Sequence, residues 1–100
     1  MAQPTTPTTA SETLVQTQKH GKVLLVTVDN PPVNALGAAV RRGLLAAVEQ
    51  AEADASVVAV LIVGAGSNFI GGADIREFGL PPQQPLLTDV CKRIEASRKP

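Results

Sequence analysis

The chain has 100 residues, nine basic and nine acidic side chains, and a hydrophobic fraction of 44%, which indicates a globular chain no larger than one small domain. The balanced charge gives no net field to attract nucleic acid, and with no tryptophan or tyrosine the chain lacks the aromatic platforms of single-strand nucleic-acid binders. The longest apolar run, residues 57–63, is far shorter than the roughly 20 residues of a membrane span. We therefore expect neither a nucleic-acid partner nor a membrane span.

The first residues, 1–12, are rich in threonine and proline, and they cannot bury enough apolar surface to repay the entropy of ordering. We predict a flexible N-terminal arm over 1–12 and a folded domain over 13–100. Cys91 is the only cysteine, so an internal disulfide is excluded and a reducing compartment is expected. A free cysteine is commonly buried, which predicts that Cys91 is a small apolar residue of a helix.

Two β-prone runs, 13–18 and 23–28, flank residues 19–22. This arrangement predicts a β-hairpin whose turn uses Gly21. His20 falls in the predicted turn without an acidic or cysteine neighbour, so we expect a solvated imidazole and assign it no function.

Pro31 and Pro32 end the second run, and Asn34 follows as a natural N-cap for a helix predicted over 35–55. The apolar residues of this segment recur at helical spacing; they are Leu36, Val40, Leu44, Val48 and Ala51. The charged residues fall mostly off this stripe and are predicted to form a solvated face; they are Arg41, Arg42, Glu49, Glu52 and Asp54.

Residues 57–63 (VVAVLIV) are apolar at every position, which predicts a central strand covered on both faces. Strand, helix and strand in this order predict a right-handed βαβ unit with parallel strands. Ligands of such sheets bind beyond the carboxyl ends of the strands, and the glycine-rich residues 64–75 (GAGSNFIGGADI) follow the second strand directly. Residues 74–78 predict one helical turn, and Pro85 is expected to open a second helix.

Three chemistries compete for the glycine-rich stretch. A dinucleotide-binding fingerprint fails because Phe69 stands where the third glycine is needed, and a phosphate-binding loop fails because Gly72 and Ala73 replace its lysine and hydroxyl residue. The third possibility is an anion hole, in which the Ala73 N–H is an unpaired first-turn donor of the helical turn at Asp74 and points outward. Such preorganised donors are worth about 2.7–4 kcal/mol each when they stabilise an oxyanion.

Residues 30–36 (NPPVNAL) and 66–75 (GSNFIGGADI) resemble the two front motifs of the crotonase (enoyl-CoA hydratase/isomerase) superfamily. The paired prolines, the Arg76-Glu77-Phe78 continuation and the proline-rich loop 79–85 are most similar to the hydratase half of the multifunctional enzymes of fatty acid β-oxidation. The resemblance implies an α/β fold in which a β-hairpin is followed by βαβ units, with 13–100 as the truncated N-terminal part of a crotonase (ClpP/crotonase-like) domain.

The resemblance also implies a function, which is hydration of a trans-2-enoyl-CoA to a 3-hydroxyacyl-CoA. In the family, the N–H that matches Ala73 is one of two oxyanion donors to the thioester carbonyl, so Ala73 is the expected catalytic residue. The expected substrate-binding residues are those that lie along bound acyl-CoA in relatives: Asn34, Ala35, Leu36, Gly71, Gly72, Ala73, Asp74, Ile75 and Arg76. Hydration requires no cofactor and no metal, and NAD is expected only if a dehydrogenase domain follows.

The acid/base glutamates and the second oxyanion glycine of family hydratases would lie beyond Pro100, so we expect this chain alone to be inactive. Asp74 is expected to interact with the end of the helical turn, and Glu77 to be solvated. Isomerase, hydrolase and decarboxylase activities remain alternatives, as does a non-catalytic CoA-binding or assembly module. The expected partners are an acyl-CoA thioester, the rest of the parent chain and possible further copies in a homo-oligomer. Cytoplasm is the expected compartment, with the peroxisome as the alternative.

Overall fold

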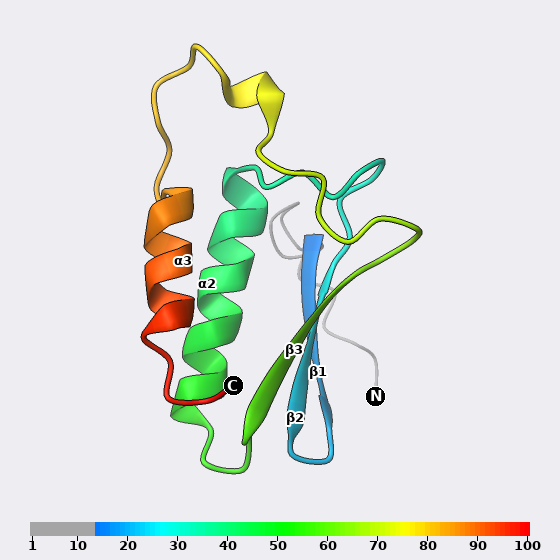
Figure 1. Ribbon diagram of the computed structural model, residues 1–100, viewed down its shortest axis with the longest axis vertical. Helices are drawn as coiled ribbons and strands as arrows, with labels where there is room; N and C mark the ends of the chain where they lie inside the picture. Colours follow the sequence, from blue (N-terminus) through cyan, green and yellow to red (C-terminus); the bar gives the residue numbers. More distant parts are fainter. Residues whose placement is uncertain (1–13) are drawn as a thin grey trace, which may run out of the picture.

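A three-stranded sheet and two helices form the protein in the computed structural model, which describes residues 14–100 (Figure 1). The elements are β1 (Val15–His20), β2 (Val23–Val28), α2 (Ala38–Ala53), β3 (Ala59–Gly64), the 3₁₀ turn η1 (Ile75–Glu77) and α3 (Leu87–Glu95). Helix α2 packs against the sheet, and α3 packs beside α2. The arm expected over 1–12 lies outside the described residues.

The predicted hairpin is present, but its turn is shorter than expected. Strands β1 and β2 are antiparallel and paired from Val15 with Val28 to His20 with Val23. Gly21, with φ of +61°, occupies the left-handed region that glycine adopts at little cost. The placement of His20 in the turn was wrong, because the ladder of backbone hydrogen bonds continues through it; its side chain is exposed.

The predicted βαβ unit is confirmed, since β2 and β3 run parallel with α2 between them in the chain. The carboxyl ends of two parallel strands meet at one edge of a sheet, so the segments after Val28 and after Gly64 emerge together. Figure 1 shows both segments, and η1 beyond them, at the end of the sheet where α2 begins.

Helix α2 begins three residues later than predicted, and Asn34 is not its N-cap. Gly37 is the N-cap residue, while Asn34 has φ of +57° and lies outside the helix. The predicted stripe is otherwise correct, because four of its members are buried in the helix: Val40, Leu44, Val48 and Ala51.

The prediction that β3 is a central strand covered on both faces was wrong for the described part of the chain. The order of the sheet is β1-β2-β3, which leaves β3 at one edge. Val60 and Ile62 pack against the core, whereas Leu61, which lies between them in the strand, is 53% exposed. An all-apolar strand indicates two faces suited to burial, and within residues 14–100 only one of them is covered.

Helix α3 begins at Leu87, not at Pro85, and the Asp89 carboxylate accepts a hydrogen bond from the Leu86 N–H at its start. Val90 is 2% exposed and joins the core formed by β2 and α2. Cys91 is exposed, so the expectation that it is buried was wrong; it lies next to the one position of α3 that is fully buried. No helix within residues 14–100 is both long and apolar enough to cross a bilayer.

Candidate functional site

The two segments that resemble family motifs lie side by side at the carboxyl end of the sheet. Leu36 and Ala73 form an isolated parallel bridge, in which the Leu36 N–H donates to the Gly72 carbonyl at 2.7 Å. The Gly71 N–H donates to the Asn34 carbonyl at 3.3 Å. Residues 34–36 and 71–73 therefore form one short two-stranded platform, which gathers most of the predicted substrate-binding residues.

Asn34 joins the two loops through its side chain. Its Oδ1 accepts a hydrogen bond from the Asn30 N–H at 2.7 Å. Its Nδ2 donates to three carbonyls of the glycine-rich loop, those of Ala65, Asn68 and Phe69, at 2.9 to 3.1 Å. Only 2% of Asn34 is exposed, so its side-chain amide is committed to the loops. Asn34 contributes only its backbone to the platform.

Two glycines of the platform meet structural requirements of their own. A Cβ at Gly71 would lie 2.5 Å from the Val33 carbonyl oxygen, and Gly72 has φ of +102°. A larger residue at position 71 would therefore collide with the backbone of Val33, and one at position 72 would be strained by the positive φ. The packing and backbone conformation of the loops thus require glycine at these two positions, whether or not a ligand is bound.

The Ala73 N–H points away from the platform. In a trans peptide the C=O and N–H groups point in opposite directions, and the Gly72 carbonyl is turned toward Leu36. No group within residues 14–100 accepts a hydrogen bond from this N–H, and Ala73 is exposed. The amide is therefore available to an external acceptor.

The helical turn that follows Ala73 does not orient its N–H, contrary to the prediction. Asp74 is the N-cap of η1, and the helical residues begin at Ile75. Ala73 thus precedes the cap and is not a first-turn donor, so the dipole of the short turn does not account for its orientation. The bridge to Leu36 orients the amide instead.

Asp74 and Arg76 form a compact ion pair. Both oxygens of the Asp74 carboxylate accept hydrogen bonds from the Arg76 guanidinium, at 2.9 and 2.8 Å, and Oδ1 also accepts from the Arg76 N–H at 3.0 Å. The guanidinium, followed by that N–H, lowers the pKa of Asp74 and keeps the carboxylate ionised. The expectation that Asp74 interacts with the helical turn is confirmed, and its charge is already partnered.

Arg41 and Glu77 were both predicted to be solvated, and both predictions were wrong. Arg41 is 7% exposed, and Glu77 is half-buried, with one carboxylate oxygen accepting from the Ala38 N–H at 2.7 Å and the other from Arg41 at 3.0 Å. The Ala38 N–H is the main cause of the lowered pKa of Glu77, and Arg41 adds to it. Arg41 lies three residues before Leu44 and seven before Val48, a spacing that could have placed it beside the buried stripe.

Ala73 lies on the wall of two pockets. One, of about 440 Å³, is bounded by the paired prolines, Ala35, Gly71 and Arg76. The other, of about 250 Å³, is bounded by Arg41, Glu77, Phe78 and the proline-rich loop. Ala73 is therefore the residue of the platform that the two pockets share with Asp74.

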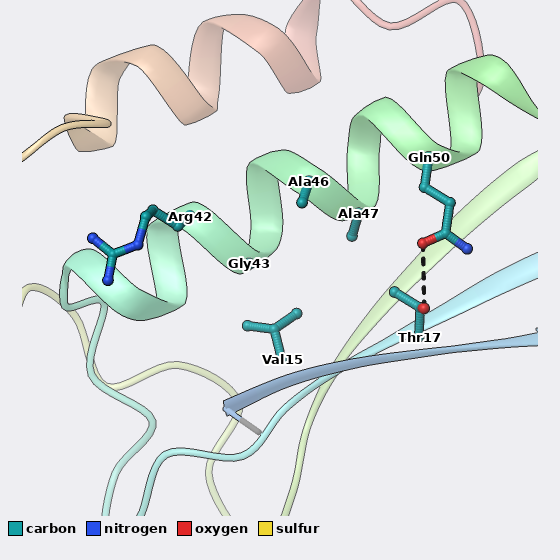
Figure 2. Close-up of a pocket in the computed structure, with 7 residues that line it drawn as sticks. All are labelled: Val15, Thr17, Arg42, Gly43, Ala46, Ala47 and Gln50. Carbon is teal, nitrogen blue, oxygen red and sulfur yellow. Dashed lines mark hydrogen bonds between the residues drawn. The ribbon is translucent and has the colours of Figure 1, made fainter. Parts of the chain in front are cut away.

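A third pocket, of about 350 Å³, lies between β1 and α2, away from the platform (Figure 2). Gly43 allows the helix to approach the strand here, since a Cβ at this position would lie 2.6 Å from the Cβ of Val15. Figure 2 shows Arg42 at the opposite end of the pocket from Gln50, which is bonded to Thr17 at 3.3 Å. The lining is aliphatic apart from Thr17, Arg42 and Gln50, and we assign this pocket no chemistry.

The described residues hold no group of three or more histidine, cysteine, aspartate or glutamate side chains that could bind a metal ion. The chemistry that the platform offers is hydrogen-bond donation from an uncommitted amide, with charged groups that are already paired beside it. Such an amide can stabilise developing negative charge on an oxygen.

The family model described as Enoyl-CoA hydratase/isomerase matches residues 18–88. The chain is 49% identical over 78 residues to the peroxisomal bifunctional enzyme of Danio rerio, and the match covers 78% of this chain and 11% of that protein. It is 38% identical over 92 residues to a probable enoyl-CoA hydratase of Rhizobium meliloti, and covers 87% of itself and 35% of that protein.

Among solved structures, a putative enoyl-CoA hydratase/carnithine racemase from Magnetospirillum magneticum superposes with a TM-score of 0.80 at 28% identity, over 89% of this chain and 36% of that chain. The α/β crotonase fold that the sequence predicts is therefore confirmed. The chain spans about a tenth of the length of the bifunctional relative and about a third of the lengths of the other two proteins.

Proposed function

Because the chain belongs to the enoyl-CoA hydratase/isomerase family, whose model matches residues 18–88, we propose that it supplies the acyl-CoA-binding front part of an enoyl-CoA hydratase. The reaction is addition of water across the double bond of a trans-2-enoyl-CoA to give a 3-hydroxyacyl-CoA in fatty acid β-oxidation. The probable enoyl-CoA hydratase of Rhizobium meliloti, which is 38% identical, supports this reaction above the other activities.

The observation that carries the proposal is the uncommitted Ala73 N–H between two pockets. The thioester carbonyl oxygen accepts a hydrogen bond from this N–H, which draws charge onto the oxygen and makes the β-carbon electrophilic toward water. As water adds, negative charge grows on the oxygen, and a fixed donor stabilises the enolate more than the ground state. Enoyl-CoA hydratases of the family perform this step without a cofactor, and NAD would belong to a dehydrogenase domain.

The remaining predicted residues have supporting roles in this proposal. The backbone of 34–36 and 71–73 forms the floor along which the ligand lies, and Ala35, Asp74, Ile75 and Arg76 line the larger pocket. The Arg76 guanidinium is exposed, but the Asp74 carboxylate partly neutralises it. We therefore expect Arg76 to contribute to binding less than an unpaired arginine would.

Replacement of the Ala73 peptide N–H by an ester oxygen tests the proposal. Incorporation of lactate, the α-hydroxy analogue of alanine, at position 73 of the complete gene product removes the N–H and keeps the side chain. Loss of one oxyanion donor is expected to lower kcat for trans-2-butenoyl-CoA by about 10²–10³-fold. The measurement is the loss of the conjugated thioester absorbance, with circular dichroism to confirm folding. Retention of kcat within twofold would show that the amide has no such role.

The family description also favours a second candidate, an enoyl-CoA isomerase. This activity uses the same amide to stabilise a dienolate and differs in where the proton returns. Incubation of the complete gene product with a trans-3-enoyl-CoA distinguishes the two, because only isomerisation creates the conjugated absorbance. The peroxisomal relative favours the peroxisome over the cytoplasm as the compartment, which fluorescent tagging of the complete gene product would test.

A further inference from the structure

We propose that Arg41 and Glu77 are positioning residues that hold the Ala73 amide in the orientation that a thioester oxygen requires. The inference rests on the proposed function of Ala73 and extends it to two side chains that act through the backbone that carries the amide. It is carried by hydrogen bonds that link Arg41 through Leu36 to the peptide group of the amide, and through Glu77 to η1, which follows the amide in the chain.

The first part of this set runs through Leu36. The Arg41 guanidinium donates to the Leu36 carbonyl at 2.8 Å, and the Leu36 N–H donates to the Gly72 carbonyl at 2.7 Å. That carbonyl and the Ala73 N–H belong to one planar peptide group, so rotation of one requires rotation of the other. A shift of Arg41 therefore changes the direction of the amide through a single intervening residue.

The second part runs through Glu77, four residues after the amide. Its Oε2 accepts from the Ala38 N–H at 2.7 Å, and its Oε1 accepts from the Arg41 guanidinium at 3.0 Å. These bonds tie the end of η1 to the first turn of α2. The peptide group between Gly72 and Ala73 is thus held by its hydrogen bond to Leu36, and η1, which follows it in the chain, is held by Glu77. Arg41 bonds both Leu36 and Glu77.

Arg41 also fixes the wall opposite the amide. Its Nε donates to the Pro85 carbonyl at 2.7 Å, and its second terminal nitrogen donates to the Gln83 carbonyl at 3.1 Å. Both carbonyls belong to the proline-rich loop, and Gln83 lies on the wall of the 250 Å³ pocket that Ala73 shares. A planar guanidinium with fixed donor directions can bond four acceptors at once, whereas a lysine ammonium cannot.

The test compares Glu77→Gln and Arg41→Lys in the complete gene product. Glu77→Gln keeps the shape and removes the charge; Arg41→Lys keeps the charge and removes the planar fork. Arg42→Lys is the matched control, because Arg42 is an exposed neighbour on the same helix. A misplacement of a reacting group by about 1 Å can lower the rate by up to about 10²-fold. We therefore expect Glu77→Gln and Arg41→Lys each to lower kcat for trans-2-butenoyl-CoA by about tenfold or more. We expect KM to change by less than about threefold.

A second readout separates positioning from simple stability. Acetoacetyl-CoA forms an enolate that absorbs in the near ultraviolet, and a well-placed oxyanion donor favours this form of the bound ligand. We expect the pH midpoint of enolate formation to rise by about one unit in both variants, as a tenfold loss of enolate stabilisation requires, and to stay unchanged in Arg42→Lys. An unchanged midpoint in both variants, or loss of folded protein in both, would overturn the proposal.

The failure of this inference is distinguishable from failure of the proposed function. If lactate at position 73 lowers kcat while Glu77→Gln and Arg41→Lys retain it within twofold, the amide is the donor and the pair does not position it. If lactate at position 73 leaves kcat unchanged, both assignments fall together.

Discussion

The Asn34 side chain sets the spacing between the loops that follow β2 and β3. Its side-chain amide forms hydrogen bonds with four backbone groups, one at residue 30 and three between residues 65 and 69. Its φ of +57° lies in the left-handed region, which asparagine tolerates better than most residues. The sequence marked this residue as important but assigned it the wrong role. An asparagine before a periodic segment is typical of a helix N-cap, whereas three of the four partners of Asn34 lie more than 30 residues away.

Substitutions at Asn34 should separate the backbone requirement from the hydrogen bonds. Asn34→Gly keeps the positive φ and loses the side-chain bonds, so we expect a destabilisation of about 2 kcal/mol. Asn34→Ala adds the cost of a left-handed residue, about 1 kcal/mol more. Asn34→Asp should be the most destabilising, because a carboxylate would face three carbonyl oxygens. Urea denaturation measures all three, and equal effects for alanine and glycine would contradict the role of φ.

At the scale of elements, the first turn of α2 is stabilised by a residue that lies outside the helix. The N-cap is a glycine with no side chain to offer, and the Glu77 carboxylate accepts from the Ala38 N–H instead. A negative group at a helix N-terminus is favourable because the first N–H groups lack partners within the helix. No local pattern indicates such a cap, which explains why the predicted start of the helix was early and why Glu77 was assigned to solvent.

The remote cap should make stability depend on pH with a defined sign. The Ala38 N–H, and then Arg41, hold the pKa of Glu77 below its usual value of 4.5. The stabilisation is therefore fully present above that pH and is lost as the pH falls through the lowered pKa of the folded state. We expect the difference in free energy of unfolding between wild type and Glu77→Gln to be larger at about pH 7 than at about pH 3.

Urea denaturation at several pH values measures this difference. Glu49→Gln is the control, because Glu49 is an exposed glutamate on α2 and its replacement should leave the pH dependence unchanged. A difference between wild type and Glu77→Gln that is constant across the pH range would show that the charge of Glu77 does not contribute.

At the scale of the whole molecule, the sequence predicted the architecture better than the site. The β-prone run 23–28 and the helical spacing in 40–51 are local patterns, and both are confirmed as β2 and α2. The contacts of Arg41 with the proline-rich loop join residues more than 40 apart, and no periodicity encodes them. The motif resemblance located the platform, but the orientation of its amide follows from a bridge that only the folded chain shows.

The uncovered face of β3 should make the isolated 100-residue chain associate. Leu61 of β3 and Val58 just before it are about half exposed. Strand β3 lies at the edge of the sheet, where the Val60 N–H bonds the Pro100 carbonyl, and exposed apolar surface at such an edge promotes association. We expect sedimentation velocity to show a mass above the 10.4 kDa of one chain that rises with concentration, and Leu61→Lys to reduce it. Gln18→Lys adds the same charge on exposed β1 and should not. A constant monomeric mass in the unmodified chain would contradict the expectation.

The long reach of the Asn34 amide also bears on the order in which the molecule assembles. Bonds that close a loop of more than 30 residues repay their entropy only after the intervening strand and helix are in place. The platform should consequently be among the last regions to form during folding and among the first to open in the native state. The hydrogen-bonded amides of Ala65 and Gly71 would then exchange with deuterium through local openings that leave the protons of β2 protected.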